Sequence, residues 1–425
     1  MKIAIFSDCY LDNTGGIVSS INAQKHALEQ NGHEVAIFTT AYPKSAKELR
    51  DLAKDHIYVV PSCKYLIRGT TPVSRRPKIV ENWLTTTHPE LQEYDIFYIH
   101  YEAGCSIAGL RLGKRLKIPT VQVMHGREDM GVTSIIPHGF RTIVATALNW
   151  FHSWYLPHPV RIKKDTYLAD TTAKAKMWTM MVNHANYAAH VVCPSHHFAK
   201  KLKHYGVKHQ IHIVPNGYPD ANFPPEPPVK SLQSSEPLNI IWHSRLSGEK
   251  RIIPFLQALA QLEKTHRPDS TRQADTLYHL DIYGDGPDRN KAARFVRRHH
   301  LNVTFHGATP FKKVQQQIQH SHLDVLASYN FDNYPMTLVE AEACGVPCFI
   351  CDPDMREIIP DGSYILGKSE SPEDMAKALS DLLTHPDRIA KMSEVMLAHR
   401  QEVLISARIK SLLALFVEIT EHNNH

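Results

Sequence analysis

Short apolar runs alternate with stretches of helical periodicity through the first half of the chain. Parallel strands that are buried on both faces read as continuous apolar runs with β-branched members. On this basis we predict strands at 2–6, 34–39, 56–60, 95–99, 119–124, 190–193 and 211–214. Helices are predicted at about 17–30, where polar Gln24 interrupts the apolar stripe, and at 105–116. This alternation indicates a doubly wound parallel sheet.

The second half repeats the same plan from Leu238 onward. Its predicted strands are 238–242, 278–283, 302–306, 322–326 and 348–351, and its predicted helices are 252–264, 288–299, 311–319, 336–344 and 373–383. Helical periodicity continues over 386–419. A chain of 425 residues is too long for one hydrophobic core, so we expect two α/β domains followed by a helical tail.

Pro- and Ser-rich sequence marks the boundary between the two series. Residues 218–237 contain the run Pro-Pro-Glu-Pro-Pro, which is typical of a linker. We therefore predict an N-terminal domain over 1–217 and a C-terminal domain over 238–400. Within the first domain, 130–185 breaks the strand–helix rhythm and is predicted to be an insertion. The last residues, 401–425, are predicted to form a helix that packs back on the N-terminal domain.

Charge is spread unevenly along the chain. The net charge of +5 divides into +10 over residues 1–210 and −5 over 211–425, and 111–210 alone carries +11. Such asymmetry suggests an anionic partner for the first half. A nucleic acid, an anionic membrane surface and a merely solvated basic face are all compatible with it.

Cysteine and histidine usage argues against a disulfide framework or a metal centre. The seven cysteines form an odd set without framework spacing, which fits a reducing compartment. Cys344, Cys348 and Cys351 have an iron–sulfur spacing, but a helix, a turn and a strand separate them, so they do not converge from one loop. The chain shows no signal peptide and no apolar run long enough to span a membrane. We expect no metal site.

The clearest candidate chemistry lies between residues 330 and 351. Two acids, Asp332 and Glu340, stand eight residues apart, and a turn between them opens a helix. Gly345 is a natural residue to end that helix, and Pro347 prevents its continuation. One acid thus precedes the helix and the other lies about one turn inside it, so both can reach the same ligand.

The start of this helix suits an anion. Backbone N–H groups near Met336, Thr337 and Leu338 have no acceptor within the helix, and the helix dipole is positive at this end. A diphosphate fits such an end. The two acids can then accept hydrogen bonds from a polyol beside it, and a nucleotide-sugar combines both groups.

A second segment supplies fixed cations. Arg245 and Lys250 lie five residues apart in His-Ser-Arg-Leu-Ser-Gly-Glu-Lys-Arg. Two cations around one turn can neutralise the charge that builds on a departing diphosphate. A solvated pair of loop residues is the alternative interpretation.

Glycines and one histidine follow predicted strands at several points. Gly15 and Gly16 open the first helix, where small residues let backbone approach a phosphate or sugar. Gly284 and Gly307 end later strands. His125 follows the strand near 119–124, at the edge where ligands of open α/β sheets bind. Tight turns and a structural histidine are the simpler alternatives.

Together these segments resemble the retaining family-4 glycosyltransferases of the GT-B fold. The text Asp332-Asn-Tyr-Pro-Met-Thr-Leu-Val-Glu340-Ala-Glu-Ala-Cys-Gly-Val-Pro is similar to that family's E-x7-E signature, with Asp332 where the family usually has Glu. Arg245 and Lys250 match its Gly-Arg-Leu-x-x-x-Lys-Gly segment, although Ser244 and Arg251 replace the glycines. The opening Gly-Gly loop, the His125-Gly pair, the Gly-Asp-Gly-Pro turn and the Gly307 loop match as well.

The resemblance implies two Rossmann-like domains that face each other across a cleft, with the donor held mainly by the C-terminal one. In that scheme Arg245, Lys250 and the N–H groups of 336–338 hold the diphosphate. Glu340 binds the ribose and Asp332 the sugar. Gly284 and Gly307 line the nucleotide site, and His125 with the Gly15-Gly16 loop contacts the sugar. The family retains the anomeric configuration and uses no obligatory metal or other cofactor.

The opening segment and the His125-Gly-Arg-Glu-Asp region resemble most the diacylglycerol glucosyltransferases. This implies transfer of a hexose, from UDP-glucose or UDP-galactose, to a membrane lipid such as diacylglycerol or a glycolipid, by a cytoplasmic enzyme bound peripherally to the inner face of the cell membrane. A saccharide acceptor in cell-surface polysaccharide synthesis is one alternative. A sugar-nucleotide epimerase, a phosphorylase and a non-catalytic module that binds anionic membranes or nucleic acid are others, although under the glycosyltransferase interpretation we expect no nucleic-acid partner.

One amphipathic stretch bears on the acceptor. Apolar residues recur at helical spacing over 140–154, at positions 140, 143, 144, 147, 148, 151 and 154, and Arg161, Lys163 and Lys164 follow. A stripe that is bounded by Trp and Lys suits the interface of an anionic bilayer, with 140–176 as the contact region. The other interpretation is that the stripe packs into the domain core.

Overall fold

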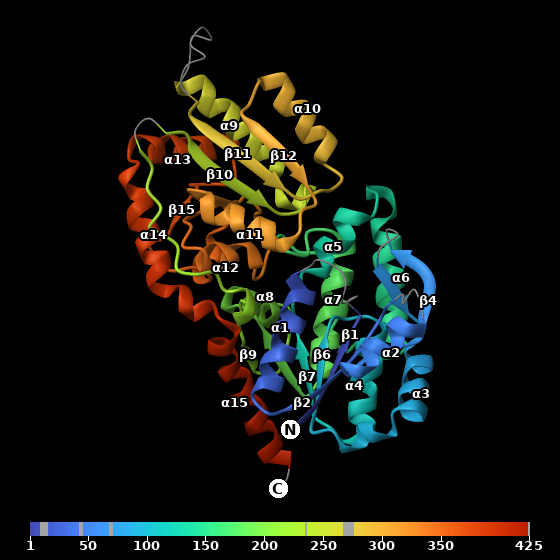
Figure 1. The fold of residues 1–425 in the computed structure, drawn as a ribbon. Coiled ribbons are helices and arrows are strands. Elements are labelled where there is room, and N and C mark those ends of the chain that lie inside the picture. The colour runs from blue at the N-terminus through green and yellow to red at the C-terminus, as the bar shows by residue number, and fades with distance from the viewer. Residues whose placement is uncertain (9–15, 42–45, 68–70, 234–235, 267–275, 424–425) are drawn as a thin grey trace. The chain divides into compact units, whose positions relative to one another are not determined.

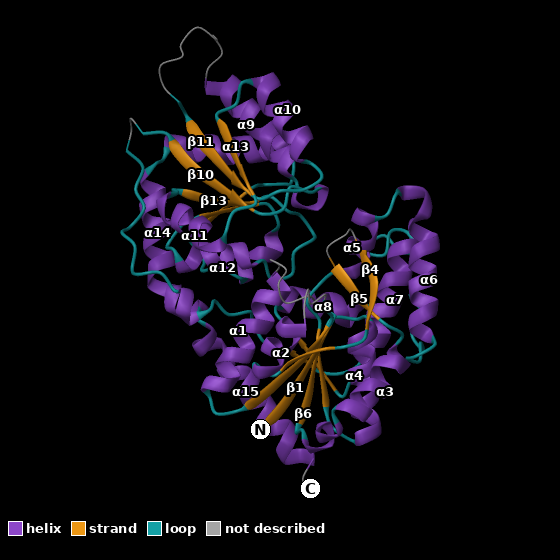
Figure 2. Ribbon diagram, turned by 45° about the vertical axis from the view of Figure 1, so that its right-hand side comes forward, coloured by secondary structure: helices purple, strands orange, loops and turns teal. Residues whose placement is uncertain are grey.

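A computed structural model describes residues 1–8, 16–41, 46–67, 71–233, 236–266 and 276–423, and Figure 1 shows their fold. The chain divides into two compact units. Unit 1 comprises Met1–Gly217 and Arg408–His425, and unit 2 comprises Tyr218–Ala407. In each unit, strands lie between helices (Figure 2).

The described part of unit 1 is built on a seven-stranded parallel sheet. The strand order is β3-β2-β1-β6-β7-β8-β9. The strands are β1 (Lys2–Ser7), β2 (Glu34–Thr39), β3 (Ile57–Val59), β6 (Ile96–His100), β7 (Thr120–Val123), β8 (His190–Cys193) and β9 (Ile211–Ile213). The central strands are buried along their length because helices cover both faces of the sheet, which is why they read as continuous apolar runs.

The helices of unit 1 connect these strands. They are α1 (Gly16–Gln30), α2 (Ala46–Lys54), α3 (Pro77–Thr87), α4 (Gly104–Leu116), α5 (Glu128–Ile135), α6 (Arg141–Ser153), α7 (Thr172–Tyr187), α8 (His196–His204) and most of α15 (Ile405–Asn423). Gln24 does not break α1: it is buried, and its Nε2 donates to Ser20 Oγ at 3.3 Å. A buried polar side chain is tolerated where it has such a partner.

Helix α4 approaches the sheet more closely than a helix with side chains on this face allows. A Cβ at Gly109 would lie 2.7 Å from the Phe6 ring, and one at Gly113 would lie 2.3 Å from Thr120. The ring of Phe6 in turn stacks on that of Phe38, with 5.1 Å between centroids. Small residues on α4 therefore set the spacing between helix and sheet.

A two-stranded hairpin was not predicted. It consists of β4 (Ser62–Ile67) and β5 (Thr71–Ser74), which pair antiparallel as a separate sheet. Neither strand is a continuous apolar run, so the sequence pattern carries no strand signal here. The insertion over 130–185 is helical, formed by α5, α6 and α7 with irregular segments between them.

Helix α6 turns its apolar stripe toward solvent. Phe140, Ile143 and Trp154 are 62%, 64% and 57% exposed, and Trp150 is 58% exposed on the same face. Ala145 and His152, on the opposite face, are buried. The expectation that the stripe packs into the core is therefore wrong for these aromatic and aliphatic residues.

The described part of unit 2 contains a six-stranded parallel sheet in the order β12-β11-β10-β13-β14-β15. Its strands are β10 (Leu238–His243), β11 (Tyr278–Tyr283), β12 (Val303–Gly307), β13 (Leu323–Leu326), β14 (Cys348–Ile350) and β15 (Tyr364–Leu366). Its helices are α9 (Ile252–His266), α10 (Arg289–His299), α11 (Phe311–His320), α12 (Met336–Ala343), α13 (Pro372–Thr384) and α14 (Asp387–His399). The predicted elements agree within about two residues at each end, and β15 is additional.

The Pro-rich segment predicted to be a linker belongs to unit 2, and its described part packs within that unit. Tyr218 is buried, and its N–H donates to Val403 O at 2.7 Å. Arg400 donates to the carbonyl oxygen of Pro224, and the Lys230 N–H donates to Ser393 Oγ at 2.9 Å. These contacts fix the segment, whose described part contains one short 3₁₀ helix, Asp220–Asn222.

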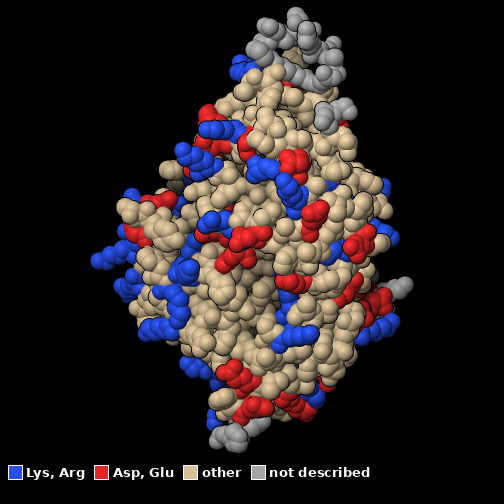
Figure 3. Space-filling view, turned by 90° about the vertical axis from the view of Figure 1, so that its left-hand side faces the viewer, with Lys and Arg blue, Asp and Glu red and all other residues tan. Residues whose placement is uncertain are grey.

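Both signs of charge share the face of the molecule shown in Figure 3, where Lys and Arg side chains form many separate groups. Arg161, Lys163 and Lys164 of unit 1 are exposed. Among the residues that the structure describes, no helix combines the length and the low polarity that a membrane crossing requires.

A chain of three histidines attaches α6 to the interior of unit 1. His152 Nδ1 lies 2.6 Å from His158 Nε2, and His152 Nε2 lies 2.9 Å from His184 Nδ1. His184 Nε2 reaches the side-chain carbonyl oxygen of Gln122, which cannot donate, at 3.0 Å. Neutral imidazoles satisfy all three contacts, because each ring can donate from one nitrogen and accept at the other. Burial lowers the pKa of His184 to about 3 and the pKa of His152 well below its ordinary value.

We predict that these hydrogen-bonded, buried histidines make the stability of unit 1 sensitive to acid. In the unfolded state each imidazole takes up a proton near pH 6.5, whereas folded His184 stays neutral down to about pH 3. Stability is therefore lost as pH falls through this window, at about 1.4 kcal/mol per pH unit for each such histidine. Denaturant unfolding of His184→Gln, followed between pH 7 and pH 4.5, should show a shallower pH dependence than the unchanged protein.

The exposed His138, on the same insertion, provides the matched control as His138→Gln. Its pH dependence should equal that of the unchanged protein. Equal slopes for His184→Gln and the unchanged protein would contradict the assignment of a neutral buried chain.

Candidate functional site

Parallel pairing brings several predicted residues of unit 2 to one edge of its sheet. β10 pairs in parallel with both β11 and β13, and β11 pairs with β12. The carboxyl ends of these strands therefore lie side by side. His243, Gly284 and Gly307 stand at or just after these ends, and the segment from Ala327 to Pro335 leads from β13 into α12.

Lys250 and Asp332 form a direct ion pair. Lys250 Nζ lies 2.7 Å and 2.9 Å from the two carboxylate oxygens of Asp332, and both side chains are 11% exposed. Ser328 Oγ donates to the same carboxylate at 2.5 Å. The ammonium group also lies over the Phe331 ring, 5.5 Å from its centroid. Although the two residues are 82 positions apart, the fold fixes their charges together.

Arg245 is placed differently. Its side chain is 63% exposed and pairs with Glu249 at 3.2 Å, while Ser247 Oγ holds the same Glu249 oxygen at 2.7 Å. In the described part of the chain its guanidinium forms no ion pair with the other predicted site residues. Exposure leaves the guanidinium accessible to a ligand, and an exposed ion pair of this kind contributes little to stability.

Arg251 stands where the family motif has glycine, and its backbone adopts a conformation that favours glycine. Its φ of 65° and ψ of 34° are left-handed, which costs a non-glycine residue about 1 kcal/mol. Its guanidinium donates to the carbonyl oxygen of Glu370, which holds this conformation in place.

Gly284 and Gly307 link the ends of β11 and β12. The Gly284 N–H donates to Gly307 O at 2.8 Å. A Cβ at Gly284 would lie 2.3 Å from the Ser244 carbonyl oxygen, so the backbone of the Arg245 loop packs directly on it. Beside them the rings of Tyr283 and His306 stack with centroids 4.3 Å apart and an angle of 4°.

Helix α12 begins as predicted, at Met336. Pro335 precedes it in an extended conformation. The expectation that the Leu338 N–H lacks an acceptor is wrong, because it donates to Pro335 O at 3.2 Å in the first turn. The Thr337 hydroxyl oxygen is buried and has no hydrogen-bond partner among the residues that the structure describes. A buried hydroxyl without a partner at a helix start suits a polar ligand there.

Glu340 belongs to a buried chain of charges that the sequence reasoning missed. His243 Nε2 lies 2.5 Å from Asp324 Oδ2, and His243 Nδ1 lies 3.2 Å from Glu340 Oε2. Burial opposes a charge on His243, but the two carboxylates outweigh it and raise its pKa to about 10. The sequence feature that could have indicated this contact is Asp324, an acid inside the apolar run of β13.

In unit 1, His125 follows β7 and pairs with a second histidine. His100 Nδ1 lies 2.8 Å from His125 Nε2, and the two rings stack at 5.0 Å. Burial lowers the pKa of His125 to about 4 and that of His100 well below its ordinary value, so both are neutral at pH 7. Gly16 begins α1 and is exposed, whereas Gly15 lies outside the described residues.

Carboxyl groups surround the same sheet edge in unit 1. Asp8, after β1, accepts the N–H groups of Cys105 and Ser106 at 2.8 Å and 3.0 Å and so caps the start of α4. Burial raises the pKa of Asp8 and that of Glu102. Burial and the charge of Asp129 raise the pKa of Glu128 to about 7.

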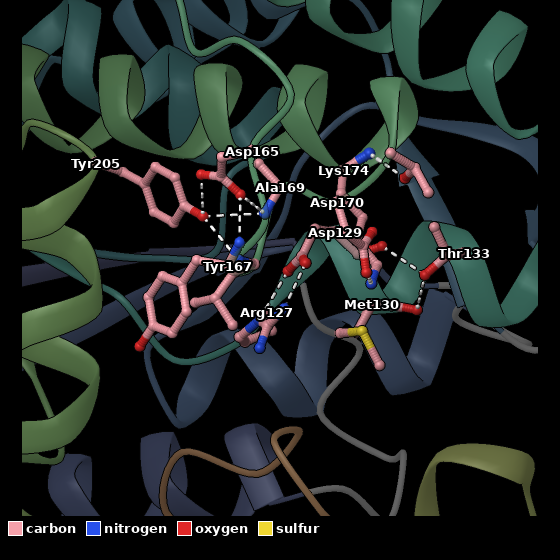
Figure 4. Close-up of polar contacts among 12 residues, drawn as sticks. Arg127, Asp129, Met130, Thr133, Asp165, Tyr167, Ala169, Asp170, Lys174 and Tyr205 are labelled. Carbon is pink, nitrogen blue, oxygen red and sulfur yellow. Dashed lines mark hydrogen bonds and ion pairs between the residues drawn. The ribbon is translucent and has the colours of Figure 1, made fainter.

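The segment after His125 is fixed by a buried ion pair (Figure 4). Arg127 Nε and Nη2 donate to the two carboxylate oxygens of Asp129 at 2.9 Å and 2.6 Å, and both side chains are almost fully buried. Figure 4 also shows how Tyr205 holds the basic segment before α7: its hydroxyl donates to Asp165 and accepts the N–H of Ala169, each at 2.9 Å.

The described residues contain no group of three or more His, Cys, Asp or Glu side chains that could hold a metal ion.

Among the predicted site residues, the structure brings together Lys250 with Asp332, and Gly284 with Gly307, on the edge where α12 begins. It leaves Arg245 exposed and His125 in the other unit. His243, Asp324 and His100 are additions, and each is a polar residue in or at the end of an apolar strand.

Comparison with known proteins assigns both units to described families. Residues 14–222 match the family model described as Glycosyltransferase Family 4. Residues 226–396 match the model described as Glycosyl transferases group 1. The two matches together span most of the chain.

Two similar relatives are alpha-monoglucosyldiacylglycerol synthases. The one from Streptococcus pneumoniae is 24% identical over 412 residues, which cover 91% of this chain and 79% of the relative. The one from Acholeplasma laidlawii is 22% identical over 449 residues, covering 100% and 98%. Among solved structures, Anabaena HepE in complex with UDP-glucose has a TM-score of 0.63 at 15% identity, covering 98% of this chain and 100% of that one. The likeness confirms the predicted GT-B fold.

We predict that the close contact at Gly284 sets the geometry of the loop that carries Arg245. Because a Cβ there would meet backbone at 2.3 Å and the φ of 140° disfavours side chains, Gly284→Ala must displace the Ser244–Arg245 peptide. We expect a fall of at least tenfold in nucleotide affinity, measured by calorimetry with UDP.

Gly32→Ala, outside the predicted site, is the matched control, because it has a φ of 81° but no atom within 4 Å of the added Cβ. It should cost about 1 kcal/mol of stability from backbone strain alone. If the two variants bind UDP equally well, the proposed link between Gly284 and the loop is wrong.

Proposed function

This chain belongs to the family 4 and group 1 glycosyltransferases, and we propose that it moves a hexose, glucose or galactose, from a UDP-sugar to a hydroxyl group of a membrane lipid with retention of configuration. Diacylglycerol or a glycolipid is the proposed acceptor class. The names of the two synthases support a lipid acceptor. The UDP-glucose complex of a structurally similar protein supports the donor.

The Lys250–Asp332 pair beside the start of α12 is the observation that carries the proposal. A largely buried ammonium is costly unless it has a partner. Here Asp332 supplies that partner and fixes Nζ, and two oxygens at 2.7 Å and 2.9 Å leave one N–H of the ammonium for a further acceptor. The α12 start, with the buried Thr337 hydroxyl, adds N–H donors of the same sign. An oxygen-rich dianion is the ligand that these groups suit.

The proposed chemistry follows from charge. When the bond between sugar and diphosphate breaks, negative charge builds on the departing UDP. Lys250, the α12 N–H groups at 336 and 337 and the exposed Arg245 would stabilise that charge more than they stabilise the intact donor. Lower energy of the charged leaving group speeds the reaction without a protein nucleophile, and a diphosphate oxygen can accept the proton of the acceptor hydroxyl.

The remaining residues keep the roles that the family motif implies, as proposals. Glu340 accepts hydrogen bonds from the ribose hydroxyls, and Asp332 contacts the sugar in addition to holding Lys250. Gly284 and Gly307 supply backbone beside the nucleotide. His125, in unit 1, acts on the transferred sugar as a neutral imidazole that can donate or accept one hydrogen bond, since its pKa is lowered to about 4.

The exposed face of α6 supports a lipid acceptor. Phe140, Ile143, Trp150 and Trp154 form an apolar stripe that faces solvent, and the rings of Trp150 and Trp154 lie 4.1 Å apart. Exposed apolar patches of this kind mark contact with a partner or a membrane. Trp side chains favour the boundary between lipid headgroups and acyl chains.

The basic segment after α6 points to the same partner. Arg161, Lys163 and Lys164 are exposed on the loop that Tyr205 and Asp165 hold in place. Each cation close to an anionic leaflet contributes about 1 kcal/mol of attraction. We propose a peripheral enzyme that works on the cytoplasmic face of the cell membrane, where an apolar stripe and adjacent cations act together.

Removal of either donor-site cation should slow transfer. We expect Lys250→Ala and Arg245→Ala to lower turnover of UDP-glucose or UDP-galactose by about 10²-fold, in line with the loss of one partner of the transition-state charge. Radiolabelled sugar transfer to a lipid extract or to diacylglycerol measures the effect.

Lys391, an exposed lysine with its own acidic partner in the same unit, gives the control variant Lys391→Ala, which should keep normal turnover. Near-normal turnover in both Lys250→Ala and Arg245→Ala would contradict the proposal that these cations stabilise the leaving group. Transfer to saccharides but not to lipids would replace the proposed acceptor.

Vesicle binding tests the membrane contact. The protein should sediment with vesicles that contain phosphatidylglycerol and be released by high salt, because exposed charges are screened. Replacing Arg161, Lys163 and Lys164 by Glu, or Trp150 and Trp154 by Ala, should each weaken sedimentation at least tenfold while UDP affinity stays unchanged.

Matched controls come from exposed residues elsewhere on the chain. Val417→Ala on α15 and Lys391→Glu on α14 should leave sedimentation unchanged. No sedimentation of the unchanged protein at low salt would rule out the membrane role of α6.

A further inference from the structure

The chain Asp324–His243–Glu340 joins three elements of unit 2 inside the fold. His243 is the last residue of β10, Asp324 lies in the neighbouring strand β13, and Glu340 lies in α12. The side chains of His243 and Asp324 are 4% and 1% exposed, and that of Glu340 is 18% exposed. Only the Glu340 end of the chain therefore reaches solvent.

The geometry fixes the protonation of the imidazole. Both ring nitrogens face carboxylate oxygens, at 2.5 Å and 3.2 Å. An ionised carboxylate can only accept, and a protonated imidazolium is the form of the ring that turns an N–H toward both carboxylates. A neutral ring would set a lone pair against one carboxylate. The raised pKa of His243 has the same cause.

The contact of His243 with Asp324 is stronger than its contact with Glu340. The contact with Asp324 is short and lies where water is excluded, so it is worth more than the 3.2 Å contact with Glu340. β10 and β13 are held in register by parallel pairing, Ile241 opposite Asp324. The imidazolium therefore has a fixed place in the sheet. Glu340 lies on a helix, and without the contact to His243 its side chain could rotate.

We propose that His243 is a positioning residue for donor binding: its imidazolium, anchored on Asp324, holds Glu340 Oε2 and so presents the rest of that carboxylate to the ribose hydroxyls of the donor. This inference rests on the proposed function, because Glu340 is the ribose ligand there. The anchor removes rotational freedom from Glu340 before binding, which increases affinity by reducing the entropy lost. The cation also offsets repulsion between Glu340 and the nearby diphosphate of the donor.

Nitrogen-15 NMR of the unchanged protein tests the charge without a variant. The two ring nitrogens of His243, assigned by difference from His243→Gln, should both show imidazolium shifts at pH 7 and should not titrate below pH 9. A ring that is neutral at pH 7 overturns the proposal.

Calorimetry tests the positioning role. UDP and 2′,3′-dideoxy-UDP should differ in affinity by about tenfold or more in the unchanged protein, as expected for lost hydrogen bonds to a charged group. In His243→Leu this preference should shrink to less than threefold, as it should in Glu340→Gln. The double variant should lose no more than either single variant, since both disable one interaction.

His279 provides the matched control, because it also contacts an acid and an amide but lies at the start of β11. His279→Leu should keep the full preference for UDP, and thermal unfolding establishes that each variant is folded. Should His243→Leu not fold, Asp324→Asn replaces it, because loss of the anchor should reduce the same preference.

The outcomes separate the inference from the function on which it rests. If Glu340→Gln loses the ribose preference while folded His243→Leu keeps it, the positioning role is wrong and the ribose assignment stands. If Glu340→Gln itself keeps the preference, Glu340 does not bind ribose, and both the role of Glu340 and the inference fall.

Discussion

Parallel pairing of β10 with its two neighbours determines where the charges of unit 2 lie. A parallel ladder sends every carboxyl end to the same edge, so residues that follow β10, β11, β12 and β13 meet there although the sequence separates them widely. Lys250 and Asp332 meet across 82 positions for this reason. Strand pairing alone does not fix the loops at this edge. The backbone of the Arg245 loop is fixed because it packs against Gly284 without room for a Cβ. Sheet topology thus fixes which residues meet, and close backbone packing fixes how precisely.

Charges at this edge are arranged in pairs and chains rather than singly. A buried ion without a partner is costly enough to shift its pKa or unfold its surroundings. Lys250 has Asp332, and His243 has two carboxylates. In unit 1 Asp8 takes its partners from the start of α4 instead of from a cation. These partners keep side chains in one conformation before any ligand arrives, which is the condition under which electrostatic stabilisation of a leaving group is effective.

The sequence predicted the elements well because buried parallel strands and their helices carry strong periodic signals. It located Asp332, Glu340 and the start of α12 because helix-start and helix-stop residues are local. It did not reveal His243 with Asp324, since their contact depends on strand register over 81 positions. It could not decide which side of α6 faces solvent, because periodicity gives a stripe but no direction. Nor could it show that Arg251 adopts a left-handed backbone conformation at a position where the family motif has glycine.

Helix α6 illustrates why burial and exposure must be argued from both faces together. Its inner face contains Ala145 and His152, and the imidazole chain to His184 gives that face specific polar partners. A helix with Phe140, Ile143, Trp150 and Trp154 available would bury these larger groups if core stability alone decided its orientation, since apolar burial is the main favourable term in folding. The fold instead fixes the helix through neutral histidines and leaves the aromatic face outside. An arrangement that forgoes this burial is understandable where another apolar phase covers the stripe, and the lipid surface that we propose beside the basic segment 161–164 would supply such a phase.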